Sequence, residues 1–286
     1  MAALTVLPVH AAALTVHDNT GHSVVLERPA SRVVALYGTF SELMLALGAR
    51  DALAGCTRAD TAIPGLENMP AVGTHMRPDP ELIAGLKPDL VLMLTGRREA
   101  AVQGERLRAL GFSVLEFRIA SFAELRLVLR ALGEATGHAD RADALERDWN
   151  GRLAAVRERV RKEAPARVFF EVRYPNLLGA GRGSIVHDII TAAGGENMLD
   201  SPEKLVRLNE EMLFAGDPDA YVAQRGPMNA AAVPVVERRH YRALRAVREG
   251  RVLMVEERMF SRPGPASVDA VELLARWLHP ACFAGR

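Results

Sequence analysis

The sequence predicts an α/β fold with parallel sheets, divided into two lobes that one long helix joins. Short aliphatic segments alternate along the chain with segments of helical spacing, which is typical of parallel sheets covered by helices. A charged stretch without proline, 139–163, has helical periodicity near the middle of the chain. A short helix-to-strand pattern occurs on both sides of this stretch, which indicates two similar lobes.

The composition is that of a globular protein and excludes several function classes. The 286 residues are enough for two lobes of about 100–150 residues each, and 49% of them are hydrophobic. Lys and Arg (36) nearly balance Asp and Glu (35), so the chain lacks the basic field that holds nucleic acids. The two cysteines, Cys56 and Cys282, are far apart, which excludes a disulfide scaffold and a CxxC metal site.

The N-terminal residues, 1–13, resemble the end of a secretory signal peptide. They are apolar and finish in small residues at 11–13, where a signal peptidase would cleave. The basic residues that begin such peptides are missing from the sequence, so we expect an exported protein with a truncated signal peptide. An irregular N-terminus is the alternative.

Each predicted element follows from its local pattern. The strands are expected at 32–36, 89–94, 112–117, 167–172, 219–222 and 251–255. Thr39 and Glu42 have the spacing of a capping box for a first helix, which Gly48 would end. Asp79 and Pro80 would begin a second helix. Its expected apolar face consists of Leu82, Ile83 and Leu86.

The stretch 139–163 is predicted to form the helix that links the two lobes, 14–138 and 164–286. A helix of about 25 residues would be roughly 37 Å long, more than a connection within one lobe requires. Its apolar residues at helical spacing are Leu145, Trp149, Leu153 and Val156. An ordinary long surface helix is the alternative interpretation.

The repeated pattern places one glutamate at an equivalent position in each lobe. Glu81 and Glu211 each stand near a helix start, seven residues before the proline of a Pro-Asp pair. Seven residues is about two helical turns, so the two glutamates would occupy the same place in two similar lobes. A chance repeat of short motifs is the alternative.

Three segments carry a resemblance to a known family: RVVALYGTFSELMLALGARDALAGCT, VGTHMRPDPELIAGLKPDLVLML and GRGSIVHDIITAAGGENML. Over about residues 14–280, the chain resembles the substrate-binding proteins of iron-complex and cobalamin ABC importers. This resemblance implies two Rossmann-like lobes joined by a single long helix, with the ligand cleft between them. It also implies a periplasmic monomer without catalytic activity or cofactor, which captures a ferric siderophore, haem or vitamin B12 for a permease and its ATPase.

The resemblance gives the paired glutamates a role. In this family a surface glutamate on each lobe docks onto arginines of the permease, and Glu81 and Glu211 match those two positions. The resemblance therefore implies that they are the docking contacts. The helix dipole also favours glutamates in a first helical turn, but that alternative explains each residue singly and not their paired placement.

The predicted ligand contacts lie where strands end, because ligands of open α/β sheets meet the loops at the carboxyl ends of the strands. These residues are Tyr37, Thr39, Arg58, His75, Met76, Arg97, Tyr174, Arg258, Phe260 and Arg262. Arginine is frequent among them, and its planar guanidinium binds carboxylates, phosphates and catecholates through paired hydrogen bonds. The pattern indicates an acidic or metal-chelate ligand, and haem, a corrinoid, a ferric siderophore and an oxyanion such as molybdate all stay open.

His75 is the residue of this set that most directly suggests a metal complex. Haem-binding proteins that the chain resembles often carry a metal-ligating tyrosine in the loop before this helix. A neutral imidazole at His75, or the Met76 thioether, would bind haem iron, and His75 would also bind corrinoid cobalt. Tyr37 and Tyr174 would supply a phenolate to ferric iron or stack on a flat macrocycle. The alternative for His75 is a hydrogen bond to a neighbouring loop.

Motifs of common enzymes are missing from the sequence, namely HExxH, the P-loop and GxSxG. The glycines of 179–184 lack dinucleotide spacing, so this segment is interpreted as a turn with a helix cap at Ser184. The enzymatic alternative is a two-lobed cytoplasmic chelatase that inserts metal into a tetrapyrrole, with His75 and a carboxylate as proton acceptors. A sugar-nucleotide transferase is a weaker alternative.

Overall fold

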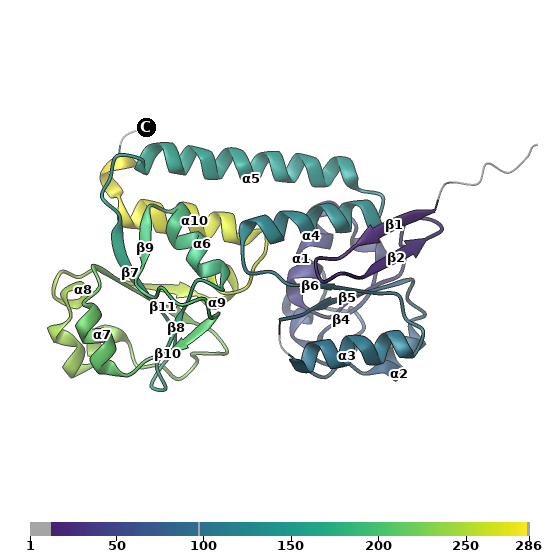
Figure 1. Ribbon diagram of the computed structural model, residues 1–286, viewed down its shortest axis with the longest axis horizontal. Helices are drawn as coiled ribbons and strands as arrows, with labels where there is room; N and C mark the ends of the chain where they lie inside the picture. Colours follow the sequence, from purple (N-terminus) through teal and green to yellow (C-terminus); the bar gives the residue numbers. More distant parts are fainter. Residues whose placement is uncertain (1–12, 97, 285–286) are drawn as a thin grey trace, which may run out of the picture. The chain divides into compact units, whose positions relative to one another are not determined.

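A computed structural model describes residues 13–96 and 98–284 of the chain (Figure 1). Nearly all of the predicted signal-peptide remnant, 1–13, lies outside the described residues. The elements divide into two compact units. The first comprises the described part of Met1–Arg118 together with Val128–Ala142, and the second comprises Ile119–Leu127 with the described part of Asp143–Arg286.

The sheet of the first unit contains four parallel strands in the order β4-β3-β5-β6. These strands are β3 (Val33–Ala35), β4 (Leu53–Cys56), β5 (Leu90–Leu94) and β6 (Val114–Phe117). Nearly all of their residues are buried, as is usual for parallel strands with helices on both faces. The prediction of strands at 32–36, 89–94 and 112–117 is confirmed.

Helices cover both faces of this sheet (Figure 1). They are α1 (Gly38–Leu47), α2 (Pro80–Gly85), α3 (Arg98–Ala109) and part of α4 (Phe122–Ala135). On one face, Ile83 of α2 and Leu107 of α3 share a buried cluster with the strands. On the other face, the ring of Phe40 in α1 lies 5.9 Å from the ring of Phe117.

The start of α1 differs from the prediction. Tyr37 has an extended backbone and is the N-cap, so Thr39 and Glu42 do not form a capping box. Thr39 instead lies in the first helical turn and is fully buried. The predicted end is confirmed, because Gly48 has the left-handed backbone (φ 78°) that favours glycine after a helix.

The start of α2 agrees with the prediction, whereas its apolar face does not. The Asp79 side chain accepts the backbone N–H groups of Glu81 and Leu82, as an N-cap does. Ile83 is fully buried, but the Leu82 side chain is 51% exposed. A helix of six residues makes fewer than two turns, so it directs only one residue fully into the core.

A two-stranded antiparallel hairpin that the sequence analysis missed precedes this sheet, β1 (Leu14–His17) with β2 (Ser23–Leu26). Its turn is organised by Asp18, whose carboxylate accepts the backbone N–H groups of Thr20, His22 and Glu116 at 2.8–2.9 Å. Burial alone would raise the pKa of this carboxyl, but these hydrogen bonds lower it below its ordinary value.

We expect Asp18→Ala to lower the free energy of unfolding by about 1.5–3 kcal/mol at pH 7, because it removes hydrogen bonds to a charged acceptor. The lowered pKa means that the folded state binds fewer protons than the unfolded state near pH 4. The stabilisation is therefore present above this pH and is lost as the pH falls through the folded pKa. In urea unfolding, the difference in the free energy of unfolding between Asp18→Ala and the parent should be smaller at pH 3 than at pH 7. Glu27→Ala, which changes an exposed glutamate, serves as control.

The long helix predicted at 139–163 is confirmed as α5 (Ala139–Val160), one unbroken helix of 22 residues (Figure 1). It begins where the sequence predicts and ends three residues earlier. Of its predicted apolar residues, Trp149 and Val156 are buried, whereas Leu145 and Leu153 are half-buried. Within the second unit, the Arg152 guanidinium joins α5 to the Glu272 carboxylate through hydrogen bonds of 2.8 and 2.9 Å.

The sheet of the second unit contains six strands and is mixed, so the prediction of a purely parallel sheet is wrong for this lobe. The strands are β7 (Ala166–Arg173), β8 (Leu178–Ala180), β9 (Gly195–Asn197), β10 (Leu205–Arg207), β11 (Ala220–Arg225) and β12 (Val252–Glu256). β9, β7, β11 and β12 are parallel neighbours, and β8 and β10 are antiparallel. Only four residues connect β7 to β8, a connection too short for a parallel pair.

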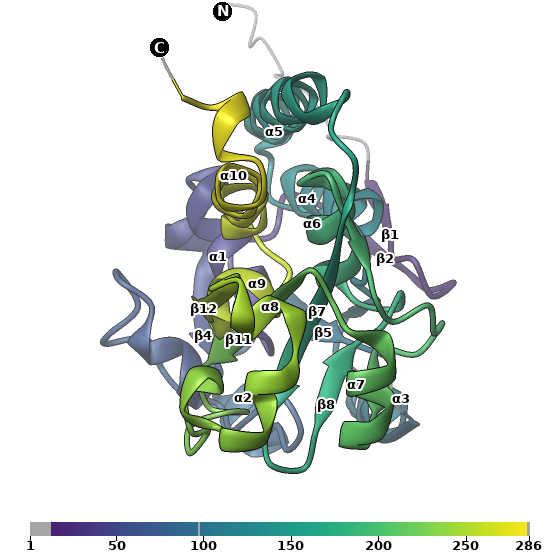
Figure 2. The same ribbon diagram turned by 90° about the vertical axis from the view of Figure 1, so that its left-hand side faces the viewer.

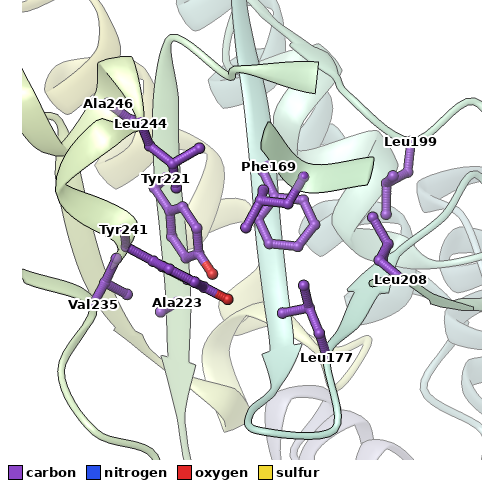
Figure 3. Close-up of a cluster of buried hydrophobic side chains, with 11 residues drawn as sticks. Phe169, Leu177, Leu199, Leu208, Tyr221, Ala223, Val235, Tyr241, Leu244 and Ala246 are labelled. Atoms are coloured by element: carbon purple, nitrogen blue, oxygen red, sulfur yellow. The ribbon is translucent and has the colours of Figure 1, made fainter. Parts of the chain in front are cut away.

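Two groups of helices cover the two faces of this sheet. They are α6 (Ile185–Ala192), α9 (Glu257–Phe260) and α10 (Ala266–Leu278) on one side, and α7 (Glu210–Gly216) and α8 (Arg245–Arg248) on the other. Figure 2 shows α6 and α10 together above the strands. Neighbouring strand residues serve opposite faces, so Phe170 stacks on Phe260 while Phe169 packs among the residues of Figure 3. Ser184 precedes α6 as predicted, but its hydroxyl donates to the Gly181 carbonyl.

Candidate functional site

The first unit brings Tyr37, Arg58 and His75 to one edge of its sheet, where the parallel strands end. Tyr37 follows β3, and Arg58 follows β4. The rings of Tyr37 and His75 lie 5.7 Å apart in an edge-to-face contact. Tyr37 is half-buried, whereas Arg58 and His75 are exposed. The prediction that strand ends collect polar and aromatic side chains therefore agrees with the geometry of this unit.

A tight backbone turn presents His75 and Met76. Thr74 and Arg77 exchange backbone hydrogen bonds of 3.1 Å, which leaves the two residues between them at the tip of a short hairpin. Gly73 begins the hairpin with a φ of +100°, and a Cβ there would come within 2.5 Å of the Arg77 carbonyl oxygen. The Gly73 carbonyl also accepts the Arg58 backbone N–H at 2.8 Å. This glycine therefore allows the turn that carries the exposed imidazole and thioether.

In the second unit, the parallel strands β7, β11 and β12 end at a common edge. Tyr174 follows β7 and is half-buried, with its backbone N–H donating to the Asn229 side-chain oxygen at 2.8 Å. Arg258 and Arg262 follow β12; the first is exposed and the second half-buried. Three of the predicted contacts therefore lie at this edge with accessible side chains.

Two predicted ligand contacts are core residues. The side chains of Thr39 and Phe260 are both 0% exposed, so they present no surface to a ligand. Phe260 ends the single turn of α9, which directs its ring onto Phe170 at 5.9 Å between ring centres. A strand-end position does not distinguish an inward from an outward side chain, which is why the sequence prediction was wrong for them. Arg97, another predicted contact, lies outside the described residues.

A buried polar network behind Tyr174 was missed by the sequence analysis. It joins Glu171 of β7, Tyr221 of β11, Asn229 and Arg238, each less than 10% exposed. The Arg238 guanidinium pairs with both Glu171 carboxylate oxygens, at 2.5 and 2.9 Å. It also lies over the Tyr174 ring, 3.6 Å from the ring centre. The available signal was a lone glutamate inside the apolar strand RVFFEV.

The electrostatics of this network keep the Arg238 guanidinium charged and the Tyr221 hydroxyl protonated. Burial alone would lower the pKa of the Arg238 guanidinium, but its hydrogen bonds to Glu171 and the charge of that carboxylate raise it above its ordinary value. Burial and the Glu171 charge raise the pKa of the Tyr221 hydroxyl well above 10. The hydroxyl therefore remains protonated and donates to Glu171 at 2.5 Å.

The two predicted docking glutamates occupy equivalent places. Glu81 is the second residue of α2, Glu211 is the second residue of α7, and both are exposed. The residues that follow them, Leu82 and Met212, are exposed to 51% and 52%. Each side chain therefore stands on a short capped helix with an exposed apolar neighbour.

The equivalence extends into the backbone after each helix. Asp89 of the first Pro-Asp pair accepts the Arg32 backbone N–H at 2.9 Å, and Asp219 of the second accepts the Arg167 backbone N–H at 2.7 Å. The Arg32 side chain donates to the Leu86 carbonyl just after α2, and the Arg167 side chain donates to the Gly216 carbonyl at the end of α7. The residues before the two prolines, Lys87 (φ 45°) and Asp217 (φ 34°), are the positive-φ residues other than glycine in the described chain. The repeat is thus structural, which argues against a chance match of short motifs.

The described residues contain no group of three or more His, Cys, Asp and Glu side chains placed to hold a metal ion. Cys56, at the end of β4, is buried, and burial together with the Asp60 charge raises the pKa of its thiol to about 11. It is therefore a neutral thiol at pH 7. Among the helices of residues 13–96 and 98–284, none is long and apolar enough to cross a membrane.

Comparison with known proteins identifies similar chains over almost the whole length. The sequence profile described as periplasmic binding protein matches residues 33–258. The uncharacterized ABC transporter substrate-binding lipoprotein YvrC of Bacillus subtilis (strain 168) is 27% identical over 276 residues, which cover 94% of this chain and 87% of the relative. A cobalamin-binding protein of Halobacterium salinarum is 28% identical over 276 residues, covering 93% of this chain and 74% of the relative.

A solved structure supports the fold. The apo form of the periplasmic haem-binding protein RhuT from Roseiflexus sp. RS-1 matches with a TM-score of 0.75 at 24% identity, covering 88% of this chain and 99% of that chain. The two-lobed α/β fold predicted from the sequence is therefore confirmed. The profile match likewise confirms the resemblance that three sequence segments carried.

Proposed function

Because the chain belongs to the periplasmic binding protein family, we propose that it is the monomeric substrate-binding protein of an ABC importer and acts outside the cytoplasm. Its substrate is a metal complex, which it delivers to a membrane permease and the associated ATPase. The protein carries out no catalysis. This function uses the paired glutamates Glu81 and Glu211, for which a cytoplasmic chelatase has no need.

The observation that supports a metal complex most directly is the Tyr37–His75 pair. The two rings meet 5.7 Å apart at the strand-end edge of the first unit, with the imidazole exposed on the tip of a hairpin. Imidazole, thioether and phenolate groups are ligands of haem iron, and imidazole also suits cobalt. We therefore expect one of Tyr37, His75 and Met76 to bind the central metal of the substrate, whose other ligands belong to the substrate itself.

The names of two relatives support a metal macrocycle as the proposed substrate class. One of the relatives described above is named for cobalamin, and a structural relative is named for haem. Both molecules present a broad apolar face, a central metal and acidic or amide edge groups. The exposed Arg58 and Arg258 and the half-buried Arg262 suit such edge groups, since guanidinium forms paired hydrogen bonds with carboxylate and phosphate.

The proposal is tested by titrating the purified chain with cyanocobalamin, haemin, ferrichrome and molybdate, followed by absorbance and calorimetry. We expect at least one of the two macrocycles to bind with a Kd of about 1 µM or below, which corresponds to about −8 kcal/mol. Molybdate should not bind. Saturable binding of none of the three metal chelates would contradict the proposed function.

We expect His75→Ala to shift the visible spectrum of bound haemin or hydroxocobalamin and to weaken its binding about tenfold, because an axial ligand is lost. The change should exceed any effect of His17→Ala, which removes another exposed histidine of the same unit. If the spectrum and affinity of His75→Ala equal those of the parent, His75 is a loop residue and does not bind the metal.

A further inference from the structure

Glu171 and Arg238 form a buried ion pair in the second unit. Glu171 is 0% exposed and Arg238 is 4% exposed, so both charges have left water. Replacing a buried ion pair with well-packed apolar residues is often neutral or stabilising. Stability alone therefore gives a weak reason for the pair, and its contacts indicate what else it does.

Four hydrogen bonds of the network converge on the Glu171 carboxylate. Glu171 accepts hydrogen bonds from Arg238, from the Tyr221 hydroxyl at 2.5 Å and from the Asn229 amide at 3.1 Å. The guanidinium donates further to the Val233 carbonyl at 2.8 and 2.9 Å. Tyr221 and Tyr241 lie side by side in the core, with ring centres 6.1 Å apart (Figure 3). The plane of the guanidinium is thus held from several directions.

The network reaches accessible surface at Tyr174. The Arg238 guanidinium lies 3.6 Å from the centre of the Tyr174 ring, and Asn229 accepts the Tyr174 backbone N–H at 2.8 Å. The same ring meets Tyr241 edge-to-face at 6.0 Å. A half-buried tyrosine would ordinarily change rotamer, but here one ring face and its backbone are both fixed.

The segment between Asn229 and Arg238 adds an apolar surface. Val233 and Val236, together with Met228 just before Asn229, are exposed to 37–55%. Asn229 and Arg238 anchor both ends of this segment in the network. An aromatic ring with exposed apolar side chains nearby suits a broad conjugated ligand and offers nothing to a small hydrated oxyanion.

We propose that Arg238 is a positioning residue for substrate binding: paired with Glu171, it holds the Tyr174 ring so that the ring stacks on the face of a metal macrocycle. This inference rests on the proposed function and deepens it by assigning the second unit a stacking contact. Arg238 itself does not touch the substrate. It acts through Tyr174, so replacing Arg238 should weaken substrate binding only when the Tyr174 ring is present.

The test is a double-mutant cycle with haemin and cyanocobalamin as probes. Tyr174→Phe keeps the ring and should bind within about twofold of the parent, whereas Tyr174→Leu should bind about tenfold more weakly. Arg238→Lys keeps the charge beside Glu171 but loses the planar group, and should also weaken binding about tenfold. In the Tyr174→Leu background, Arg238→Lys should have almost no further effect.

A purely structural role predicts a different cycle. Arg238→Lys would then weaken binding by the same factor in both backgrounds, and that result would overturn the proposal. Thermal unfolding of each variant shows how much stability is lost independently of binding. If Arg238→Lys does not fold, the double variant Glu171→Gln with Arg238→Met takes its place in the cycle, because it removes both buried charges together.

A second readout needs no substrate. The chain has four tyrosines, so 3-fluorotyrosine labelling gives a simple ¹⁹F spectrum in which Tyr174→Phe identifies one signal. That signal should move and broaden in Arg238→Lys, and an unchanged signal would contradict the positioning role. A parent protein that binds neither probe would overturn the proposed stacking on a macrocycle, and one that also fails to bind ferrichrome would contradict the proposed function. The ¹⁹F comparison would still decide whether Arg238 orients the ring.

Discussion

Reversing both proposed docking glutamates, as Glu81→Arg with Glu211→Arg, is expected to abolish transport and to leave substrate affinity unchanged. Both side chains are exposed on the second residue of a short capped helix, so neither supports the core. The proposed partner surface is basic, and like charges placed face to face cost several kcal/mol in an interface. One reversal should weaken uptake, and two should stop it, because each unit is proposed to supply one contact to the permease.

Uptake of radiolabelled cyanocobalamin into cells that carry the cognate permease measures the transport half of this prediction, and calorimetry with the purified variant measures the binding half. A matched control reverses one exposed glutamate elsewhere in each unit, as Glu134→Arg with Glu196→Arg. The control should transport normally. Binding tenfold weaker in the Glu81/Glu211 variant would place these residues in the substrate site or in the fold instead.

Glu171→Ala is expected to lower the free energy of unfolding by about 3–5 kcal/mol, because it leaves the buried Arg238 charge without its partner. The Tyr221 hydroxyl would lose its acceptor as well. Domains are stable by only about 5–15 kcal/mol, so this variant should unfold at a much lower urea concentration than the parent. No other single change discussed above removes as many buried hydrogen bonds.

The control for this variant is Glu196→Ala, an exposed glutamate on β9 of the same sheet, which should cost less than about 0.5 kcal/mol. Equilibrium urea unfolding at pH 7, followed by circular dichroism, gives both values. A loss below about 1 kcal/mol for Glu171→Ala would mean that water or a rearranged side chain compensates the Arg238 charge, and that the pair is not a rigid unit.

The docking prediction concerns one glutamate in each unit because the two units contain similar helix-to-strand segments. Their helix-to-strand segments share the cap, the glutamate, the Pro-Asp pair, and the arginine that bonds back to the helix end. If the proposed permease consists of two equivalent halves, it would present two equivalent binding surfaces to these two segments. The repeat therefore predicts that single variants at Glu81 and Glu211 have effects of similar size.

The sequence by itself determined the helix ends and strands that depend only on neighbouring residues. Asp79 and Pro80 start α2 because a side-chain acceptor and a fixed φ satisfy a helix N-terminus within a few residues. Gly48 ends α1 because the left-handed backbone favours glycine. The charged, proline-free stretch made α5 predictable, and the aliphatic segments made the parallel strands predictable. The Pro-Asp repeat was readable for the same reason, since each copy lies within a dozen residues.

Tertiary structure alone decided how residues distant in sequence meet. Arg238 and Glu171 are 67 residues apart, and nothing near either one indicates the other. Tyr37 meets His75 because the hairpin that carries His75 lies beside the strand-end edge where β3 and β4 finish. Thr39 and Phe260, which also follow strands, face the core. The short β7–β8 connection turned an expected parallel sheet into a mixed one. Strand ends can be located from composition, but side-chain direction and partner choice depend on packing, which only the folded chain sets.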